Sequence, residues 1–228
     1  MTLLAGGPAR PVQDGGVKLS TAVRHLAEMA DVSSEKLPLR DTEMGWPLEE
    51  LWVAGELPEA PGSLEFGSVV LVLDLPADEL SWLVRHPTAE WIGSQLRLGK
   101  RPFAWAYRPC AWPVWNHRHR RLARFWSADQ GAHIEVLELL QERKLDRLSI
   151  LEAPLGDLFQ QLTEELAVSR HHLRRVLDQY WEPDWRRDHK GYDESPEDHL
   201  WRAAQAVSEI YQALSELGST EVGPANGR

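Results

Sequence analysis

The sequence predicts an α+β (or α/β) fold, in which a small mixed sheet of three to four strands with helical cover is followed by a C-terminal antiparallel helical region. Residues 68–75 form a continuous β-branched and aliphatic run, which is typical of a strand covered on both faces. From residue 131 onward, apolar residues recur at helical spacing. The chain has 228 residues, 43% of them hydrophobic, which is enough for one large domain or two small ones.

The first half of the chain alternates between helical and extended patterns. Apolar residues at helical spacing predict a helix that begins near Val17. Extended segments are expected at 48–55, 68–75 and 103–107, and a fourth at 122–126. These segments supply the strands of the predicted sheet.

Two short helices are expected between the second and third strands. The first begins at Pro76, which has acidic residues after it in the first turn. Pro87 interrupts this helix, because the residue before a proline avoids the helical region. The second carries Trp91 and Leu96 and ends at Gly99.

The second half is predicted to be helical. A short helix covers 134–141, and a long apolar stripe with steps of three and four predicts a helix over 155–180. The last helix begins with Ser195 as its N-cap and is closed by Gly218. The two long helices are expected to be neighbours, since each has an apolar stripe to cover.

This pattern divides the chain into four parts. Residues 1–16, rich in Gly and Pro, are interpreted as a flexible tail. Residues 17–128 form the α/β unit, 129–217 the helical unit, and 218–228 a second flexible tail.

Composition excludes several classes of protein. A formal net charge of −10 argues against a protein that coats nucleic acid with its whole surface. A single cysteine, Cys110, excludes an internal disulfide and a cysteine-built zinc site. The start of the chain lacks the features of a secretory signal, and the longest strongly apolar run, 69–73, is too short to cross a bilayer. We therefore expect a cytoplasmic protein with no membrane contact and no cofactor.

The charge distribution is uneven. Residues 91–128, here called the basic segment, hold eight Lys or Arg and no Asp or Glu. Arginine can contact phosphate through two nitrogens, and tryptophan rings can stack on bases. The residues expected to bind a ligand are Arg118, Arg120, Arg121, Arg124, Trp112 and Trp115. Alternatively, the tryptophans are core residues covered by arginines, or the segment is a protein interface.

The histidines suggest a different interpretation. His171 with Asp178, or His189 with Asp193, could supply acid–base or metal groups in a site between the sheet and the helical region. No His-x-x-x-His or Glu-x-x-His spacing accompanies them. The segment 184–193 that carries two of these residues is either a functional loop or an interhelical loop held by aromatic packing and Arg–Asp pairs.

The order helix, strand ending in Gly55, loop and second hydrophobic strand resembles the core of the nucleotidyltransferase-like superfamily. That resemblance implies a Gly-Ser turn followed by an Asp-x-Asp pair that holds two metal ions. Here Glu56 stands in place of the serine, and the Asp-x-Asp positions fall near Ser68 and Val70. The resemblance covers residues 17–110 in topology only, and it implies a copy that does no two-metal chemistry.

The whole sequence also resembles an uncharacterised actinobacterial family of unknown function. The segments that carry this resemblance are 51–57, 111–117 and 184–192. It implies no particular activity.

The function expected from these observations is non-catalytic. A nucleotidyltransferase-like protein would bind a phosphate-bearing ligand, either a nucleotide or nucleic acid, or a partner protein through the basic segment. The alternatives are an enzyme that uses the His and Asp residues above, and a purely structural interaction protein.

Overall fold

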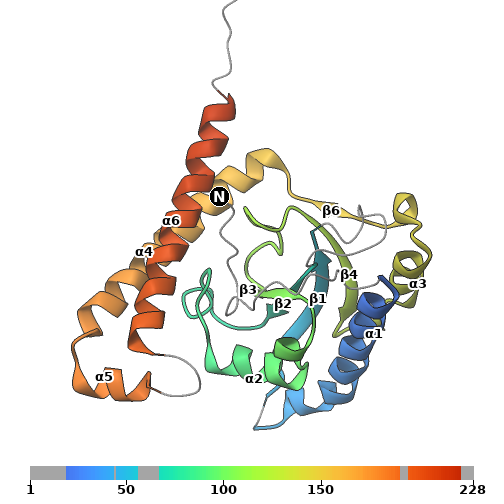
Figure 1. Ribbon diagram of the computed structural model, residues 1–228, viewed down its shortest axis with the longest axis horizontal. Coiled ribbons are helices and arrows are strands. Elements are labelled where there is room, and N and C mark those ends of the chain that lie inside the picture. Colours follow the sequence, from blue (N-terminus) through green and yellow to red (C-terminus); the bar gives the residue numbers. More distant parts are fainter. Residues whose placement is uncertain (1–18, 44, 56–66, 191–194, 222–228) are drawn as a thin grey trace, which may run out of the picture. The chain divides into compact units, whose positions relative to one another are not determined.

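A computed structural model describes residues 19–43, 45–55, 67–190 and 195–221 (Figure 1). The chain divides into two compact units. The first contains residues up to Leu75 and Arg85–Glu152, and the second contains Pro76–Val84 and residues from Ala153 onward. The predicted α+β class, with a mixed sheet and a C-terminal helical region, is confirmed.

The first unit carries the sheet together with α-helices and short 3-10 helices. Its elements are α1 (Leu19–Lys36), η1 (Leu37–Asp41), β1 (Leu48–Ala54), β2 (Ser68–Leu73), α2 (Pro87–Gln95), η2 (Leu98–Lys100), β3 (Ala104–Pro109), β4 (Arg121–Ser127), β5 (Gly131–Ala132), α3 (Ile134–Glu142), η3 (Leu145–Arg147) and β6 (Leu151–Glu152). The strand order is β3-β2-β1-β4-β5, and β6 pairs with β4. Only the β2–β3 pair is parallel among the described strands. Two-residue β5 and β6 make the sheet wider than expected.

One face of the sheet is covered by helices. Trp126, Leu51, Leu71 and Tyr107 are paired in turn across β4, β1, β2 and β3, so their side chains share this face. The indole nitrogen of Trp126 donates to Ser34 of α1 at 2.9 Å. We call this side the helix face.

The opposite side is here called the pocket face. The strand neighbours of the helix-face residues point to this side, because successive side chains alternate between the two faces of a sheet. The cross-strand row on this face contains Glu50, Val72 and Arg108, and Trp52 is paired with Arg124 beside it. The sheet register therefore brings acidic, basic and aromatic side chains together on one surface.

The second unit is a helical hairpin. It contains α4 (Leu155–Gln179), α5 (Pro183–Asp188) and α6 (Pro196–Glu221). The two long helices lie side by side in opposite directions (Figure 1). Residues of α4 at steps of three and four are buried, including Leu158, Leu162 and Leu166. The segment Pro76–Val84 also belongs to this unit. Its Trp82 indole nitrogen donates to Glu209 of α6 at 3.0 Å.

Three local predictions are wrong. Residues 76–84 form hydrogen-bonded turns instead of a helix, since Leu83 takes a positive φ of 61° that interrupts helical geometry. Gly218 does not end the last helix, which continues to Glu221; a glycine inside a helix costs only about 1 kcal/mol. The stretch predicted as a loop after 183 begins with the helix α5. The expected tail at 1–16 lies outside the described residues.

Candidate ligand-binding site

Arg108 organises the middle of the basic segment and is only 1% exposed. Its Nε and Nη2 donate to the Pro113 carbonyl at 3.1 and 2.8 Å, and Nη2 also donates to the Trp115 carbonyl at 3.2 Å. The guanidinium carbon lies 5.4 Å from the ring centroid of Trp112. A guanidinium offers five donors in a rigid fork, so it can hold several carbonyls at once. Arg108 therefore fixes the loop that follows β3.

The same loop is closed by Asn116, which is fully buried. Its Oδ1 accepts from the backbone N–H groups of Arg118 and His119, both at 2.8 Å, and its own N–H donates to the His119 carbonyl. Burial lowers the pKa of His119 to about 3, and nearby Arg108 adds to the effect. The imidazole is therefore neutral at neutral pH, and this turn is a rigid structural element.

Two of the proposed anion-binding arginines are held by carboxylates from elsewhere in the first unit. Arg124 Nη1 lies 2.5 Å from Glu50 Oε1, and Arg121 Nε lies 3.1 Å from Glu152 Oε1. A phosphate would have to displace these carboxylates. The carboxylates that pair with these two arginines come from outside the basic segment, Glu50 from β1 and Glu152 from β6.

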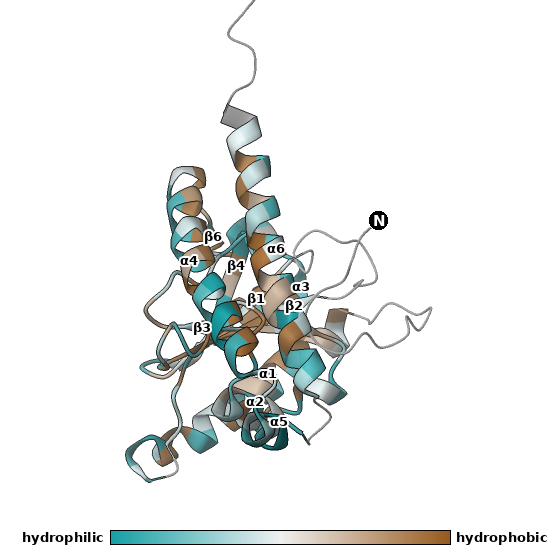
Figure 2. Ribbon diagram, turned by 90° about the vertical axis from the view of Figure 1, so that its left-hand side faces the viewer, coloured by the Kyte–Doolittle hydropathy of each residue, from teal (hydrophilic) through white to brown (hydrophobic). Residues whose placement is uncertain are grey.

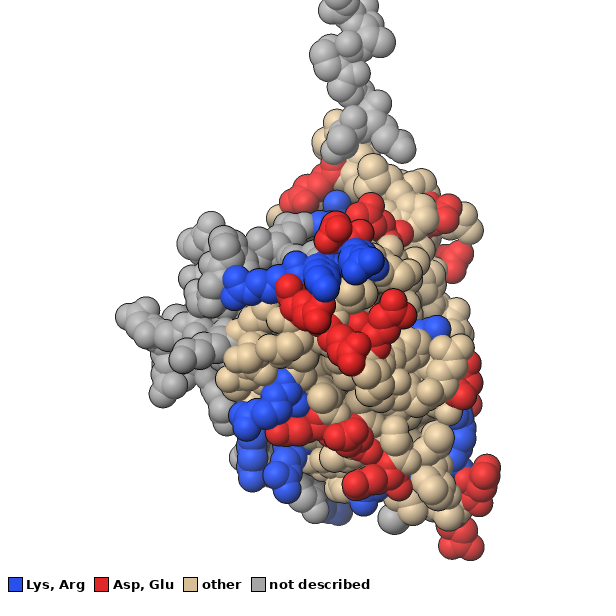
Figure 3. All heavy atoms as spheres, turned by 90° about the vertical axis from the view of Figure 1, so that its right-hand side faces the viewer, with Lys and Arg blue, Asp and Glu red and all other residues tan. Residues whose placement is uncertain are grey.

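The proposed residues differ in exposure. Arg118 and Arg120 are exposed, as is Arg121, whereas Trp115 is buried and Trp112 is half-buried. Figure 3 shows that, on the face that carries α1 and α3, basic and acidic side chains lie next to one another. A broad basic surface is not seen on that face.

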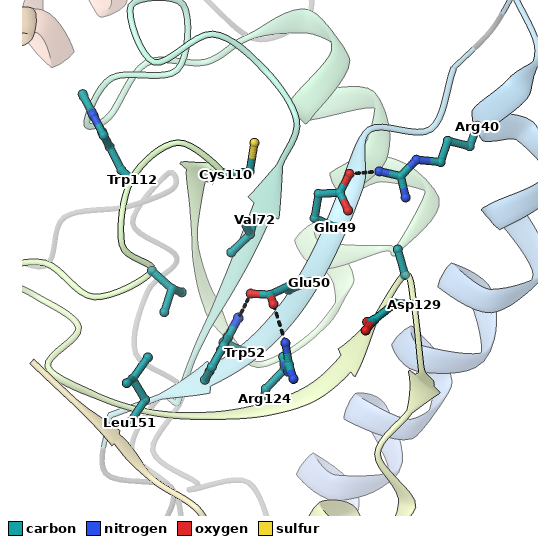
Figure 4. A pocket seen from close by; sticks show the side chains of 12 residues that line it. Arg40, Glu49, Glu50, Trp52, Val72, Cys110, Trp112, Arg124, Asp129 and Leu151 are labelled. Atoms are coloured by element: carbon teal, nitrogen blue, oxygen red, sulfur yellow. Dashed lines mark hydrogen bonds and ion pairs between the residues drawn. The ribbon is translucent and has the colours of Figure 1, made fainter.

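A cavity of about 640 Å³ opens over the pocket face (Figure 4). Ligand sites in proteins have volumes of roughly 300–1,000 Å³. The cavity is lined by Arg40, Glu49, Glu50, Trp52, Val72, Cys110, Trp112, Val114, Arg124, Ala128, Asp129 and Leu151. Two of the predicted ligand-binding residues, Trp112 and Arg124, belong to this lining.

Glu50 is a lining residue of the cavity whose carboxylate is held by two side chains. Its Oε2 accepts from the Trp52 indole at 2.7 Å, and its Oε1 is paired with Arg124. The Arg124 guanidinium carbon lies 5.6 Å from the Trp52 ring centroid, which is within the range of a cation–π interaction. Among the described residues, the hydrogen-bond partners of Glu50 are one for each carboxylate oxygen, namely Trp52 and Arg124, and a carboxylate oxygen can accept a further hydrogen bond. The three side chains thus form a preorganised acceptor on the pocket face.

The rim of the cavity is also polar. Arg40 of η1 pairs with Glu49, and Cys110 Sγ donates to Asp74 Oδ1 at 3.3 Å. Burial, together with the Asp74 contact, raises the pKa of the Cys110 thiol. A hydrogen bond from Ser127 lowers the pKa of Asp129. The lining carries two guanidinium groups and three carboxylates, so its formal charge is −1.

Sequence reasoning missed Glu50, Trp52 and Arg40. A usable signal was present for the first two, because residues two apart on a strand share a face. Arg40 gave no such signal, since its place beside Glu49 depends on how η1 packs.

A serine–histidine contact lies near this cavity. Ser127 Oγ is 3.1 Å from His133 Nε2, and burial lowers the pKa of His133. Ser127 is only 1% exposed, and it also donates to Asp129. A nucleophile needs access to substrate and its own base, so this contact is not the arrangement of a hydrolase.

The alternative acid–base residues lie in the second unit. His171 and Asp178 are exposed on α4 about two turns apart. The His189 ring stacks on Trp185 at 4.1 Å between centroids, and its Nδ1 donates to the Trp185 carbonyl at 2.8 Å. Asp193 lies outside the described residues. No group of three His, Cys, Asp or Glu able to hold a metal ion occurs within the described ranges.

The positions that matter for the nucleotidyltransferase resemblance are described in part. Gly55 follows β1 with a φ of 93°, a conformation that favours glycine. Ser68 and Val70 lie on β2, so no carboxylate stands at the Asp-x-Asp positions.

A family model of a domain of unknown function, DUF7711, matches residues 17–216. The chain belongs to the DUF7711 family. No curated protein and no solved structure matches it. The expected membership of a family of unknown function is confirmed for this DUF7711 chain. In the described part of the chain, no helix has the length and apolarity needed to span a bilayer.

Proposed function

We propose that this chain binds, without catalysis, a small planar ligand of the nucleobase type in the cavity over the pocket face. The observation that carries the proposal is the Trp52–Glu50–Arg124 group, whose carboxylate is held in place with unused acceptor capacity. Two tryptophans in the lining supply aromatic surface for a flat ring.

The charge of the lining narrows the ligand class. With a formal charge of −1 and both guanidinium groups paired, the cavity favours a ligand that donates hydrogen bonds over a bare anion. Glu and Asp accept hydrogen bonds from the exocyclic amine of cytosine. A nucleobase with an amino group therefore suits Glu50 and Asp129 better than one without.

Cytidine and uridine make a matched test, because cytosine has an amine where uracil has a carbonyl oxygen. Isothermal titration should show that cytidine binds more tightly than uridine, by about tenfold for one hydrogen bond. Glu50→Gln should reduce this preference, since its amide nitrogen donates where the carboxylate accepts. Trp201→Ala, far along the chain on α6, is the control. Equal affinity for the two nucleosides would contradict the proposal that the Glu50 carboxylate recognises the amino group of the ligand.

A second candidate is the phosphate-bearing ligand or partner protein bound by the basic segment. The exposure of Arg118 and Arg120 supports it, and these arginines, with Trp112, would make the contacts. Binding of single-stranded DNA, RNA and nucleotides should then weaken with salt and with Arg118→Ala/Arg120→Ala. A folded sample that binds none of these probes at low salt would exclude the nucleic-acid version.

The nucleotidyltransferase-like assignment belongs to the same proposal. It is supported by the Gly55 turn after β1, and it would be a non-catalytic copy because β2 lacks the carboxylate pair. The alternative is an enzyme that uses the histidines as acid–base or metal groups, and stoichiometric zinc, iron or manganese in the protein would favour it. Metal analysis of the purified protein separates the two.

A further inference from the structure

One side of the hairpin formed by α4 and α6 carries exposed apolar residues. Phe159 and Leu177 of α4 and Tyr211 of α6 are 44%, 51% and 58% exposed, and each directly follows a buried residue of its own helix. A following residue points about 100° further around the helix. Because α4 and α6 run in opposite directions (Figure 1), this rotation leads to the same side of the pair for both helices. We call this the open side; Figure 2 shows apolar residues recurring along both helices.

Contacts at one end of the hairpin agree with this placement. Trp181, just after α4, lies about 40° from Leu177 around the helix, and Glu197 follows the buried Pro196 of α6. Arg186 of α5 contacts both of them. Its Nη2 lies 2.7 Å from Glu197 Oε1, and its guanidinium carbon lies 5.9 Å from the Trp181 ring centroid. Side chains that the rotation assigns to the open side therefore meet there.

The other side of the hairpin is covered within the same unit. Glu209 directly precedes the buried Ile210, so it points the opposite way around α6 from Tyr211. It accepts a hydrogen bond from the indole of Trp82, which is buried and belongs to the segment Pro76–Val84. The exposed apolar residues thus lie on the side away from this segment, and exposed apolar surface of this kind marks interaction sites.

The open side is basic as well as apolar. Arg170 and Arg174 are exposed and lie within about 60° of Leu177 around α4. The acidic residues of this helix are all about 100° or more from Leu177; they are Asp157, Glu164, Glu165 and Asp178. Within the ranges that the structure describes, neither of the two arginines forms an ion pair. Their charges are available to a partner that brings carboxylates.

The shape and length of this surface suit a third helix. Two helices that lie side by side can take another along them, as in a helical bundle, and such a helix presents apolar residues at i, i+3, i+4 and i+7. From Phe159 to Leu177 the surface runs for roughly 27 Å, which is about five turns. Carboxylates beside the apolar stripe of that helix would face the two arginines.

We propose that the open side binds an acidic amphipathic helix of a partner protein. The apolar residues of that helix pack on Phe159, Leu177 and Tyr211, and its carboxylates pair with Arg170 and Arg174. This surface is separate from the cavity over the pocket face and from the basic segment.

Three fluorescently labelled synthetic peptides test the proposal by anisotropy with the full chain. Each is about 20 residues long with leucine at i, i+3, i+4 and i+7, and they differ in carrying Glu, Gln or Lys beside the leucines. The Glu peptide should bind at least about tenfold more tightly than the Lys peptide. Phe159→Lys/Leu177→Lys should weaken its binding by about a hundredfold or more. Circular dichroism checks that each variant is folded.

Two neighbouring arginines give a matched pair of variants. Arg174→Glu should weaken binding of the Glu peptide by about tenfold, whereas Arg175→Glu, about 100° further around the helix, should leave it nearly unchanged. Arg170→Glu/Arg174→Glu should reverse the preference, so that the Lys peptide binds more tightly than the Glu peptide.

Several results would overturn the proposal. A wild type that binds none of the peptides, or binds the Glu and Lys peptides equally, is one. Equal effects of Arg174→Glu and Arg175→Glu are another. Sedimentation equilibrium covers the remaining occupant: a wild-type dimer that Phe159→Lys/Leu177→Lys abolishes would assign the open side to a second copy of this chain instead.

Discussion

The contact between α2 and β3 gives a quantitative test of the helix face. A Cβ added at Gly93 would lie 2.5 Å from the Tyr107 hydroxyl oxygen and 3.3 Å from Leu98 Cδ1. Real Cβ atoms essentially never approach another heavy atom closer than 3.0 Å, so the helix or the ring must move by about 0.5 Å. Tyr107 is half-buried with its hydroxyl oxygen inside the protein, and burial raises the pKa of its phenol.

The expected effect of Gly93→Ala combines two opposing terms. Forced overpacking costs about 2 kcal/mol, while alanine in place of glycine in a helix gains about 1 kcal/mol. The net loss of unfolding free energy is therefore about 1 kcal/mol. In a Tyr107→Phe background the hydroxyl is gone, so the same change should become stabilising by up to about 1 kcal/mol.

Urea denaturation of the four members of this double-mutant cycle measures the effect as the unfolding free energy. Gly99→Ala is the control, because nothing lies within 4 Å of a Cβ added there. If Gly93→Ala changes stability equally in the wild-type and Tyr107→Phe backgrounds, the close packing of α2 on β3 is not as described.

Three further predictions concern the first unit. Arg108→Lys should lower the unfolding free energy by about 2–4 kcal/mol in urea denaturation, since an ammonium cannot hold the Pro113 and Trp115 carbonyls together; a change below about 0.5 kcal/mol would contradict this role. The pKa of His119 is about 3 in the folded protein and 6.5 in the unfolded chain. The neutral imidazole therefore contributes fully to the unfolding free energy above pH 6.5, and this contribution is lost as the pH falls from 6.5 to 3. Acid titration of stability should therefore show a loss of about 3 kcal/mol by pH 4 that is absent in His119→Gln; identical pH profiles would count against it. Asp74→Asn should speed alkylation of Cys110 at pH 8 severalfold, because the carboxylate contributes to the raised thiol pKa; an unchanged rate would show that burial alone sets it.

Parts of the fold could be predicted because the residues that they bury follow one another in a local sequence pattern. The run 68–73 is buried on both faces of the sheet, and the α4 stripe is a long helical repeat. The segment 76–84 misled the prediction, since a proline followed by acids is equally compatible with a turn. Strands β5 and β6 have two residues each and leave no periodic signal.

The candidate site was less predictable for a physical reason. Arg108 and Arg118 look alike in the sequence, yet one is buried against backbone carbonyls and the other is exposed. Backbone acceptors leave no trace in side-chain composition. Likewise, the acid that holds Arg124 comes from β1, 74 positions away, so the acid-free segment could not reveal it.

Cys110 reports directly on the central proposal, because it lines the cavity beside Trp112. Mass spectrometry can follow its alkylation with and without a saturating nucleoside. Cytidine should slow the labelling in the wild type, and uridine should slow it less. Labelling that proceeds at the same rate with and without every nucleoside would contradict ligand binding over the pocket face.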